Sequence, residues 1–334
     1  MKEGAEQVEI NEVAAKIEKL GYKPHVILGV ERTVIAAVGD ERSKAVLQSL
    51  ESIPGVDKVV PILQPFKLAS KTVKIEHSVV KVGGVPVGGN EFIVIAGPCA
   101  VEDEGQIVAA AQAVKAAGAQ LLRGGAFKPR TSPYAFQGHG EEGLKLLKIA
   151  SRETGLPIVT EVMSVHDLDL IAKYADCLQI GARNAQNFSL LKAVGQSALP
   201  VFLKRGMAMT IQEFLMSAEY ILSEGNPNVI LCERGIRTFE TATRNTLDLN
   251  AVPVLLERTH LPMAVDPSHG TGYWQYVEPM AKAAVACGAD CLMIEVHPDP
   301  KSAVSDGGQS LKLHTFEALM KNIRPFVKAA GRRL

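Results

Sequence analysis

A single cysteine follows an apolar run in the segment IVIAGPCAVEDE, residues 93–104. Four apolar residues lead into Gly97, Pro98 and Cys99 before the chain turns acidic. The chain has five cysteines, an odd number without a CxxC pair, which does not suggest a disulfide framework. A thiol that is not packing filler is a candidate metal ligand or nucleophile. Taken alone, Cys99 is more often a small buried residue of a core, and this alternative stays open.

Ionisable side chains also follow the later β-rich runs of the sequence. They occur at or just past the end of each run, at Arg123, Lys128, Arg130, Glu161, Arg183, Lys204, Arg205, Glu233, Arg234, Arg237, Asp266, His269, Glu295, His297 and Asp306. The whole chain is neutral, with 36 basic and 36 acidic residues, so the cations among these positions form a local concentration.

Eight short β-rich runs alternate with amphipathic stretches from residue 92 onward. The runs are FIVIAG, QLLRGG, IVTEVM, LQIGA, VFLKRG, VILCERG, MAVDPSH and CLMIEVH. Helical spacing of apolar residues marks the stretches at 103–117, 141–154, 166–175, 187–195, 211–223, 276–287 and about 312–329. This alternation predicts parallel strands with crossover helices, and eight repeats predict an α/β fold of the (β/α)8 (TIM) barrel type. A doubly wound sheet is the alternative, but AGPCAVE lacks its GxGxxG turn.

The βα loops of a barrel converge on one face, so the residues at the strand ends are expected to meet there. Cations held together in a low-dielectric cleft repel one another, which predicts that anions balance them. Because arginine binds phosphate and carboxylate bidentately, the cluster predicts a pair of substrates that carry at least one phosphate each. The alternative for any one cation is an ion pair with Glu161, Glu233 or Asp266.

Four of these residues form a candidate metal site. Cys99, His269, Glu295 and Asp306 lie at or past the ends of the first, seventh and eighth predicted strands, which are neighbours when the barrel closes. A thiolate, an imidazole and two carboxylates suit one divalent transition ion with an open position for a substrate oxygen. The mixed ligand set does not choose between Mn, Fe, Co and Zn. The alternative for His269 is a strand-end histidine with satisfied hydrogen bonds.

The first 70 residues have a different pattern. The predicted elements are a helix over 8–20, strands over 25–30 and 33–39, a helix over about 41–52 and a strand over 56–63. This order matches a small α+β ferredoxin-like unit, βαββαβ, whose first strand is apparently missing. We therefore predict a ferredoxin-like (ACT-like) domain at 1–70 and a barrel domain at 71–334 that opens with a hairpin within 73–89.

Composition excludes several classes of protein. Basic and acidic residues balance, so no global positive field would attract nucleic acid. No apolar run approaches the roughly 20 residues that cross a bilayer, and the first residues, MKEGAEQVEI, lack the pattern of a signal peptide. We therefore expect a cytoplasmic protein with no membrane or nucleic-acid partner.

Six motifs carry a family resemblance: AGPC, LRGGAFKPRTSPYAFQG, QIGARN, ILCERG, VDPSHG and EVHPDPKSAVSDGGQSL. In the region that holds them, the chain resembles the 3-deoxy-D-arabino-heptulosonate 7-phosphate (DAHP) synthases. Within that family it is most similar to the short microbial type, which carries a ferredoxin-like regulatory domain at the N-terminus.

The resemblance implies a metal-dependent, aldol-like condensation of phosphoenolpyruvate (PEP) with erythrose 4-phosphate, the first step of the shikimate pathway. It implies one divalent ion per subunit, held by Cys99, His269, Glu295 and Asp306. The residues that match the PEP-binding set are Arg123, Lys128, Arg183, Lys204 and Arg234. The pair from KPRT that matches the aldose phosphate site is Arg130 and Thr131.

Catalytic roles are implied for Cys99 and His269 through the metal, and for Lys128 directly. Lys128 is expected to donate or relay a proton, because a lysine surrounded by other cations should have a lowered pKa. Relatives of this type are inhibited by tyrosine or phenylalanine at the ferredoxin-like domain, and tetramers are common among them. The resemblance therefore implies such an inhibitor and a homo-oligomer for this chain.

Two other functions stay open. The related octulosonate 8-phosphate synthases, which use arabinose 5-phosphate, usually have KANRS where this chain has KPRTS. The KPRT form favours the four-carbon aldose. A non-catalytic barrel that senses phosphosugars would keep the arginines but would not need a metal ion that polarises an aldehyde.

Overall fold

The computed structural model describes residues 1–29, 32–39, 44–60, 65–129 and 132–334. The chain forms two compact units. One unit comprises Met1–His77 together with Arg258–His260, and the other comprises Ser78–Glu257 and Leu261–Leu334. The division predicted at residue 70 stays a prediction.

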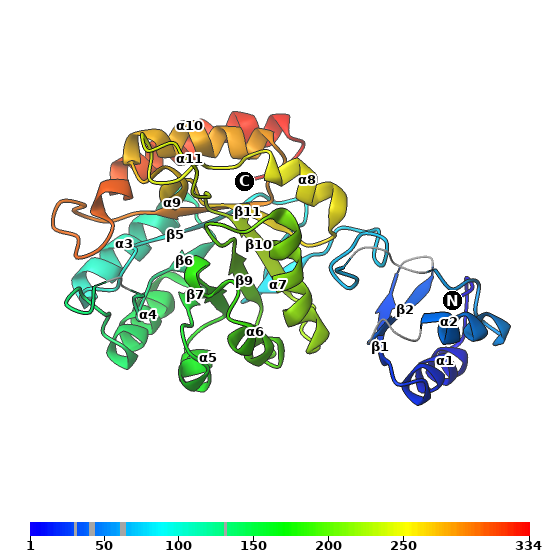
Figure 1. Ribbon diagram of the computed structural model, residues 1–334. Helices are drawn as coiled ribbons and strands as arrows, with labels where there is room; N and C mark the ends of the chain where they lie inside the picture. Colours follow the sequence, from blue (N-terminus) through cyan, green and yellow to red (C-terminus); the bar gives the residue numbers. More distant parts are fainter. Residues whose placement is uncertain (30–31, 40–43, 61–64, 130–131) are drawn as a thin grey trace. The chain divides into compact units, whose positions relative to one another are not determined.

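The larger unit is a closed barrel of eight parallel strands, which confirms the predicted (β/α)8 fold (Figure 1). The strands, in order around the barrel, are β5 (Ile93–Gly97), β6 (Leu121–Arg123), β7 (Ile158–Glu161), β8 (Cys177–Ile180), β9 (Val201–Lys204), β10 (Val229–Glu233), β11 (Met263–Val265) and β12 (Cys291–Glu295). Pairing of β12 with β5 closes the ring and sets Glu295 opposite Gly97. The chain positions just after these two strands are therefore neighbours, as the sequence predicts.

Helices surround the ring of strands (Figure 1). They are α3 (Glu104–Ala117), α4 (Glu141–Thr154), α5 (Leu168–Ala172), α6 (Phe188–Gly195), α7 (Ile211–Ser223), α8 (Ala251–Arg258), α9 (Pro267–Thr271), α10 (Trp274–Ala286) and α11 (Leu313–Ala329). Local signals set their ends: the Asp103 side chain accepts from the Gln106 amide at the start of α3, and Thr210 forms a capping box with Glu213 at α7. The helices α8 and α9 are absent from the prediction; α9, PSHGT, has no large apolar side chain that could set a periodic pattern.

The amino-terminal end of the barrel is closed by apolar packing. The hairpin of β3 (Val80–Val82) and β4 (Val85–Val87) falls within the segment predicted to hold one. Its valines join one cluster of buried residues with the strand side chains, among them Ile93, Phe202 and Met293. Cys177, Cys232 and Cys291 belong to the same cluster.

The smaller unit contains α1 (Gln7–Lys19), β1 (Lys23–Leu28), β2 (Thr33–Val38), α2 (Lys44–Leu47) and the 3-10 helix η2 (Gln48–Ser52). The two strands pair antiparallel, and a small core forms from Val13, Ile17, Tyr22, Leu50 and Val56.

Two predictions for the smaller unit have a mixed outcome. Residues 56–60 are not in a strand, and the rest of the strand predicted at 56–63 lies outside the described residues. No strand forms at residues 1–6, but the Met1 amino group donates to the Thr33 carbonyl at 2.8 Å, beside the start of β2. A missing first strand is consistent with this arrangement. None of the helices among the described residues combines the length and the apolar character needed to cross a membrane.

Candidate active site

A cavity of about 450 Å³ lies among the segments that follow the barrel strands. Ionisable residues that line it come from the carboxyl ends of β6 to β12 or the loops after them: Arg123, Lys128, Glu161, Arg183, Lys204, Arg234, Arg237, Arg244, His269 and Asp306. The predicted convergence of the strand ends on one face therefore holds for this set, and seven of the ten residues are arginine or lysine.

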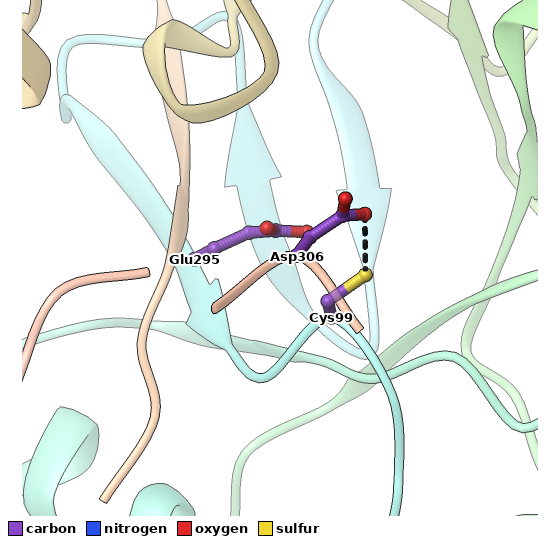
Figure 2. A group of neighbouring side chains, drawn as sticks. All are labelled: Cys99, Glu295 and Asp306. Carbon is purple, nitrogen blue, oxygen red and sulfur yellow. Dashed lines mark hydrogen bonds between the residues drawn. The ribbon is translucent and has the colours of Figure 1, made fainter. Parts of the chain in front are cut away.

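Three of the four predicted metal ligands form one compact group (Figure 2). Their ligand atoms, the Cys99 sulfur and one carboxylate oxygen each from Glu295 and Asp306, all lie within 4.8 Å of one another. The Cys99 thiol donates to Asp306 Oδ2 at 3.2 Å. A soft sulfur beside two carboxylates suits a divalent transition ion. The donor chemistry therefore fits a metal, although the ligand roles stay a prediction.

His269, the fourth predicted ligand, lies beside this group rather than within it. Its Nε2 atom is 3.4 Å from Glu295 Oε1. Its other ring nitrogen, Nδ1, is 2.7 Å from Asp266 Oδ2, and Asp266 Oδ1 accepts the His269 backbone N–H at 2.9 Å. Because Asp266 caps α9 and holds Nδ1, the Nε2 atom is turned toward Glu295 and is available as a ligand.

Backbone geometry places the sulfur and the carboxylates. A Cβ added at Gly97 would lie 2.1 Å from the Arg123 carbonyl oxygen, so glycine permits the close approach of β5 and β6 just before Cys99. Asp306 adopts a left-handed conformation, with φ of 54°, and is the one non-glycine with positive φ in the described ranges. This conformation costs a residue other than glycine about 1–2 kcal/mol, so the surroundings of Asp306 must stabilise it.

The electrostatics of the three grouped donors differ. Burial, followed by the nearby Glu295 carboxylate, raises the pKa of the Cys99 thiol to about 11. Burial also opposes ionisation of the two acids, but His269 and Arg123 lower the pKa of Glu295, and Arg244 and His269 lower that of Asp306. Both carboxylates are therefore ionised at neutral pH, whereas the thiol keeps its proton until a cation favours the thiolate.

Two cations, one at the end of β6 and one from the loop after it, lie against the group. The Arg123 guanidinium donates to Glu295 Oε1, and both side chains are buried. The Lys128 ammonium donates to the Cys99 sulfur and to the Cys99 carbonyl oxygen, each at 2.9 Å. Arg123 and Lys128 both line the cavity, so these contacts hold the sulfur and one carboxylate in place beside it.

The expectation that Lys128 has a lowered pKa is wrong. Burial does act to lower the pKa of Lys128, but the Cys99 sulfur and the Glu161 and Glu295 carboxylates outweigh it and raise the pKa above its usual value. The reasoning from sequence counted neighbouring cations and not the acidic groups that the fold brings within reach. Lys128 is therefore an ammonium group at neutral pH.

The ion-pair alternative applies to some of the predicted cations. Arg205 Nη1 donates to Glu233 at 2.8 Å and to Asp248 at 2.9 Å, and its Nε donates to the Met209 carbonyl, so it is a structural residue beside the cavity. Lys204 donates to Asp266 at 2.6 Å but also lines the cavity.

Arg183 and Arg234 line the cavity as predicted. Arg234 is buried, and its Nη1 donates to the Gly235 carbonyl at 3.2 Å. Burial lowers the pKa of Arg234, with only partial compensation from Asp266. A buried guanidinium with so little acidic compensation favours an anionic ligand.

Arg130 and Thr131 lie outside the described residues, and their assignment stays a prediction. Pro129 and Ser132, on either side of them, both line the cavity. His297 does not line it: its Nε2 is 3.2 Å from Glu102 Oε1.

Sequence reasoning missed several polar residues at the site. Gln179, Arg244 and Asn245 line the cavity, and Gln309 contacts Glu295. Gln179 is inside a strand, and the other three are in long loops where no strand end marks them. Two of them had a usable signal: Gln179 is the first residue of the motif QIGARN, and Gln309 falls within the motif that contains Asp306.

Comparisons with known proteins agree on one family. The profile of the DAHP synthetase I family matches residues 72–329, and that of the DAHP synthase ferredoxin-like domain matches residues 1–64. A phospho-2-dehydro-3-deoxyheptonate aldolase of Thermotoga maritima is 47% identical over 331 residues, which cover 99% of this chain and 98% of the relative. A 2-dehydro-3-deoxyphosphooctonate aldolase of Syntrophotalea carbinolica is 34% identical over 262 residues, covering 73% of this chain and 94% of that protein.

Solved structures give the same result. The crystal structure of the Thermotoga maritima phospho-2-dehydro-3-deoxyheptonate aldolase (DAHP synthase) matches with a TM-score of 0.80 at 47% identity, covering 99% of this chain and 97% of the other. A truncated form of the Thermotoga maritima 3-deoxy-D-arabino-heptulosonate 7-phosphate synthase matches with a TM-score of 0.75 at 46% identity, covering 80% of this chain and 98% of the other.

Proposed function

The chain belongs to the DAHP synthetase I family, and we propose that it condenses PEP with D-erythrose 4-phosphate and water to give DAHP and phosphate. One structural observation carries this proposal: a thiol and two carboxylates group together beside a cavity that Asp306 helps to line, and seven of the ten ionisable residues of that lining are arginine or lysine. Two phosphorylated substrates need the cations, and an aldehyde that must become electrophilic needs a Lewis acid.

The metal site that we propose comprises Cys99, Glu295 and Asp306, with His269 Nε2 as the fourth donor. When bound, a divalent ion at this place would act as a Lewis acid toward the aldehyde oxygen of erythrose 4-phosphate. Mn, Fe, Co and Zn all suit the donor set. Lys128 and Arg123, which line the cavity, hold the sulfur and the Glu295 carboxylate in position beside it.

The cations of the cavity bind and orient the substrates. The enol carbon of PEP attacks the aldehyde carbon, water adds to the phosphate-bearing carbon of PEP, and phosphate then leaves from the tetrahedral intermediate. Arg183, Lys204 and Arg234 stabilise the negative charge of that phosphate. Holding the two substrates in the orientation needed for reaction lowers the activation barrier of the condensation by up to about 7–11 kcal/mol.

Lys128 is the proton donor or relay in this proposal. Its ammonium lies 2.9 Å from the Cys99 sulfur and lines the cavity. Because its pKa is raised, Lys128 is protonated at neutral pH and carries a proton to donate. The Lys128→Met variant should bind both substrates and turn over slowly. Near-normal turnover in that variant would remove the role from Lys128.

The assay that tests the function is phosphate release from PEP with each of two aldoses. We expect release with erythrose 4-phosphate, loss of activity with EDTA, and recovery when Mn, Fe, Co or Zn is added back. Preference for arabinose 5-phosphate would favour the octulosonate 8-phosphate reaction instead. Absence of release with either aldose, with substrate binding intact, would indicate a phosphosugar sensor.

Regulation, assembly and location are also proposals. The ferredoxin-like domain at 1–70 would bind tyrosine or phenylalanine and inhibit the barrel at 71–334, in a homotetramer in the cytoplasm. Turnover with and without each amino acid, before and after deletion of residues 1–70, tests the inhibition. Unchanged inhibition in the truncated protein would refute it.

A further inference from the structure

Two side chains link the carboxylates of the proposed metal site. Gln309 is 2% exposed, and its Nε2 donates to Glu295 Oε2 at 2.7 Å. Its Oε1 accepts from Arg244 Nη1 at 2.7 Å. The same Nη1 donates to Asp306 Oδ1 at 3.1 Å. One continuous set of hydrogen bonds thus connects Glu295, Gln309, Arg244 and Asp306.

Glu295 is held at both of its oxygens. Arg123 donates to Oε1 and Gln309 donates to Oε2, so rotation of the carboxylate would break one of two buried hydrogen bonds. Each oxygen still has a second lone pair for another partner. The arrangement fixes the direction of the carboxylate without using its capacity as a ligand.

Asp306 needs support because its backbone is left-handed. The Gln309 backbone N–H and the Ser310 hydroxyl donate to the Asp306 carbonyl, each at 3.2 Å. These two hydrogen bonds stabilise the turn that begins at Asp306. At the side chain, Arg244 donates to Oδ1 while the Cys99 thiol donates to Oδ2. Among the described residues, Arg244 is the only cation that forms an ion pair with Asp306.

The loop that carries Arg244 is itself anchored beside His269. The Arg244 backbone N–H donates to the Thr271 carbonyl at 2.9 Å, and the Asn245 side chain donates to the His269 carbonyl at 2.8 Å. A Cβ at Gly272 would lie 2.4 Å from the Arg244 Cβ, so the two loops approach closely there. The position of Arg244 is therefore set by the segment that carries the proposed histidine ligand.

We propose that Arg244 and Gln309 are a positioning pair, which orients the Glu295 and Asp306 carboxylates before an ion binds and so sets the affinity of the site for metal. This inference rests on the proposed metal site and adds two residues that the motifs did not assign. Partners that orient metal ligands typically contribute 10–100-fold in metal affinity, because without them the free site samples unproductive rotamers. Gln309 does not line the cavity, so its effect is separable from substrate binding.

The test is a Co²⁺ titration of the metal-free full-length protein, with affinity measured by competition against a chelator. The sulfur-to-cobalt charge-transfer band reports coordination by Cys99. We expect Gln309→Leu to weaken Co²⁺ binding by about 10–100-fold and to keep the band at saturation. Gln309→Glu keeps an acceptor for Arg244 but places a second carboxylate against Glu295, so it should weaken binding at least as much. Arg244→Lys should bind Co²⁺ better than Arg244→Met.

A matched control is Gln196→Leu. Gln196 donates to Glu224 at 2.9 Å in an exposed Gln–Glu pair, so its loss should leave Co²⁺ affinity unchanged. Thermal unfolding of the metal-free variants reports folding, and Gln309→Glu or Arg244→Lys replaces any variant that fails to fold. Wild-type affinity in folded Gln309→Leu and Arg244→Met would overturn the positioning pair. A wild-type protein that binds no Co²⁺ and shows no band would overturn the metal site itself.

Discussion

The two ends of the barrel bury cysteine equally well but surround it differently. Cys291, the first residue of β12, is fully buried in the apolar cluster under the β3–β4 hairpin. Cys99, just past the end of β5, is 2% exposed and contacts Lys128 and Asp306. Burial raises the pKa of both thiols, so neither burial nor acidity distinguishes them.

The residues that surround the two cysteines distinguish the amino end of the barrel from its carboxyl end. At the amino end, strand side chains pack against one another and against valines, which stabilises the fold. At the carboxyl end, buried charges are held in a polar network around a cavity, which costs stability unless ligands and partners compensate. Stability and chemistry are therefore separated along the strand direction, as is typical of this fold.

The largest effect is expected for Cys99→Ala. Removal of the sulfur takes one donor from the proposed metal site, so DAHP formation should fall by roughly 10⁴-fold, about 5 kcal/mol in the barrier. Phosphate release at saturating metal and substrates measures it, with thermal unfolding as the check on folding. Activity within tenfold of wild type would mean that the two ends of the barrel do not differ in this way.

Phe202→Ala should produce the converse result. Phe202 is fully buried in the cluster at the amino end, so its truncation should lower the free energy of unfolding by about 3–5 kcal/mol. Urea unfolding measures that loss. Turnover per folded molecule should stay near wild type, because the side chain does not line the cavity. Loss of turnover at unchanged stability would contradict the separation.

Arg234→Met tests the difference, among the described residues, between paired and unpaired arginines at the carboxyl end of the barrel. Loss of this guanidinium should raise the KM for PEP by about 10–100-fold, as expected for a charged hydrogen bond of about 1.5–3 kcal/mol. Steady-state kinetics with varied PEP measures it. The matched variant is Arg205→Met, which should lower stability and leave the KM nearly unchanged, because Arg205 already pairs with Glu233 and Asp248. An equal rise in KM in both variants would argue against the assignment.

The smallest effect is expected for Cys291→Ala. Removing the buried thiol group leaves a small cavity, and we expect a loss of about 1 kcal/mol in the free energy of unfolding. The midpoint of urea unfolding measures it, and phosphate release should match wild type. A large loss of activity here would indicate that the amino end also contributes to the chemistry.

Periodic signals predicted most of the barrel unit. Strands and helices of several turns repeat every 2 or 3.6 residues, so α3, α4, α6, α7 and α11 begin and end within two residues of the prediction. The prediction fails elsewhere: α8 and α9 were missed, and residues 56–60 are not in a strand.

For the candidate site, the sequence predicted which positions converge but not how they pair. Position at a strand end is a property of the chain, so Cys99, Glu295 and Asp306 could be grouped in advance. Pairing depends on distances between loops. Arg205 turns toward Asp248, Lys128 lies among acidic groups, and Gln309 reaches Glu295 from a loop with no periodic pattern.

By itself, the sequence determined the alternation of strands and helices, the motifs of the family and the residue types at the mouth of the barrel. Only the tertiary structure decided which buried cations are already paired, which side chains orient the two carboxylates, and where the pKa of Lys128 moves. The physical reason is range: periodicity and strand order act along the chain, whereas a hydrogen bond or a charge interaction depends on a few ångströms between residues that are far apart in sequence.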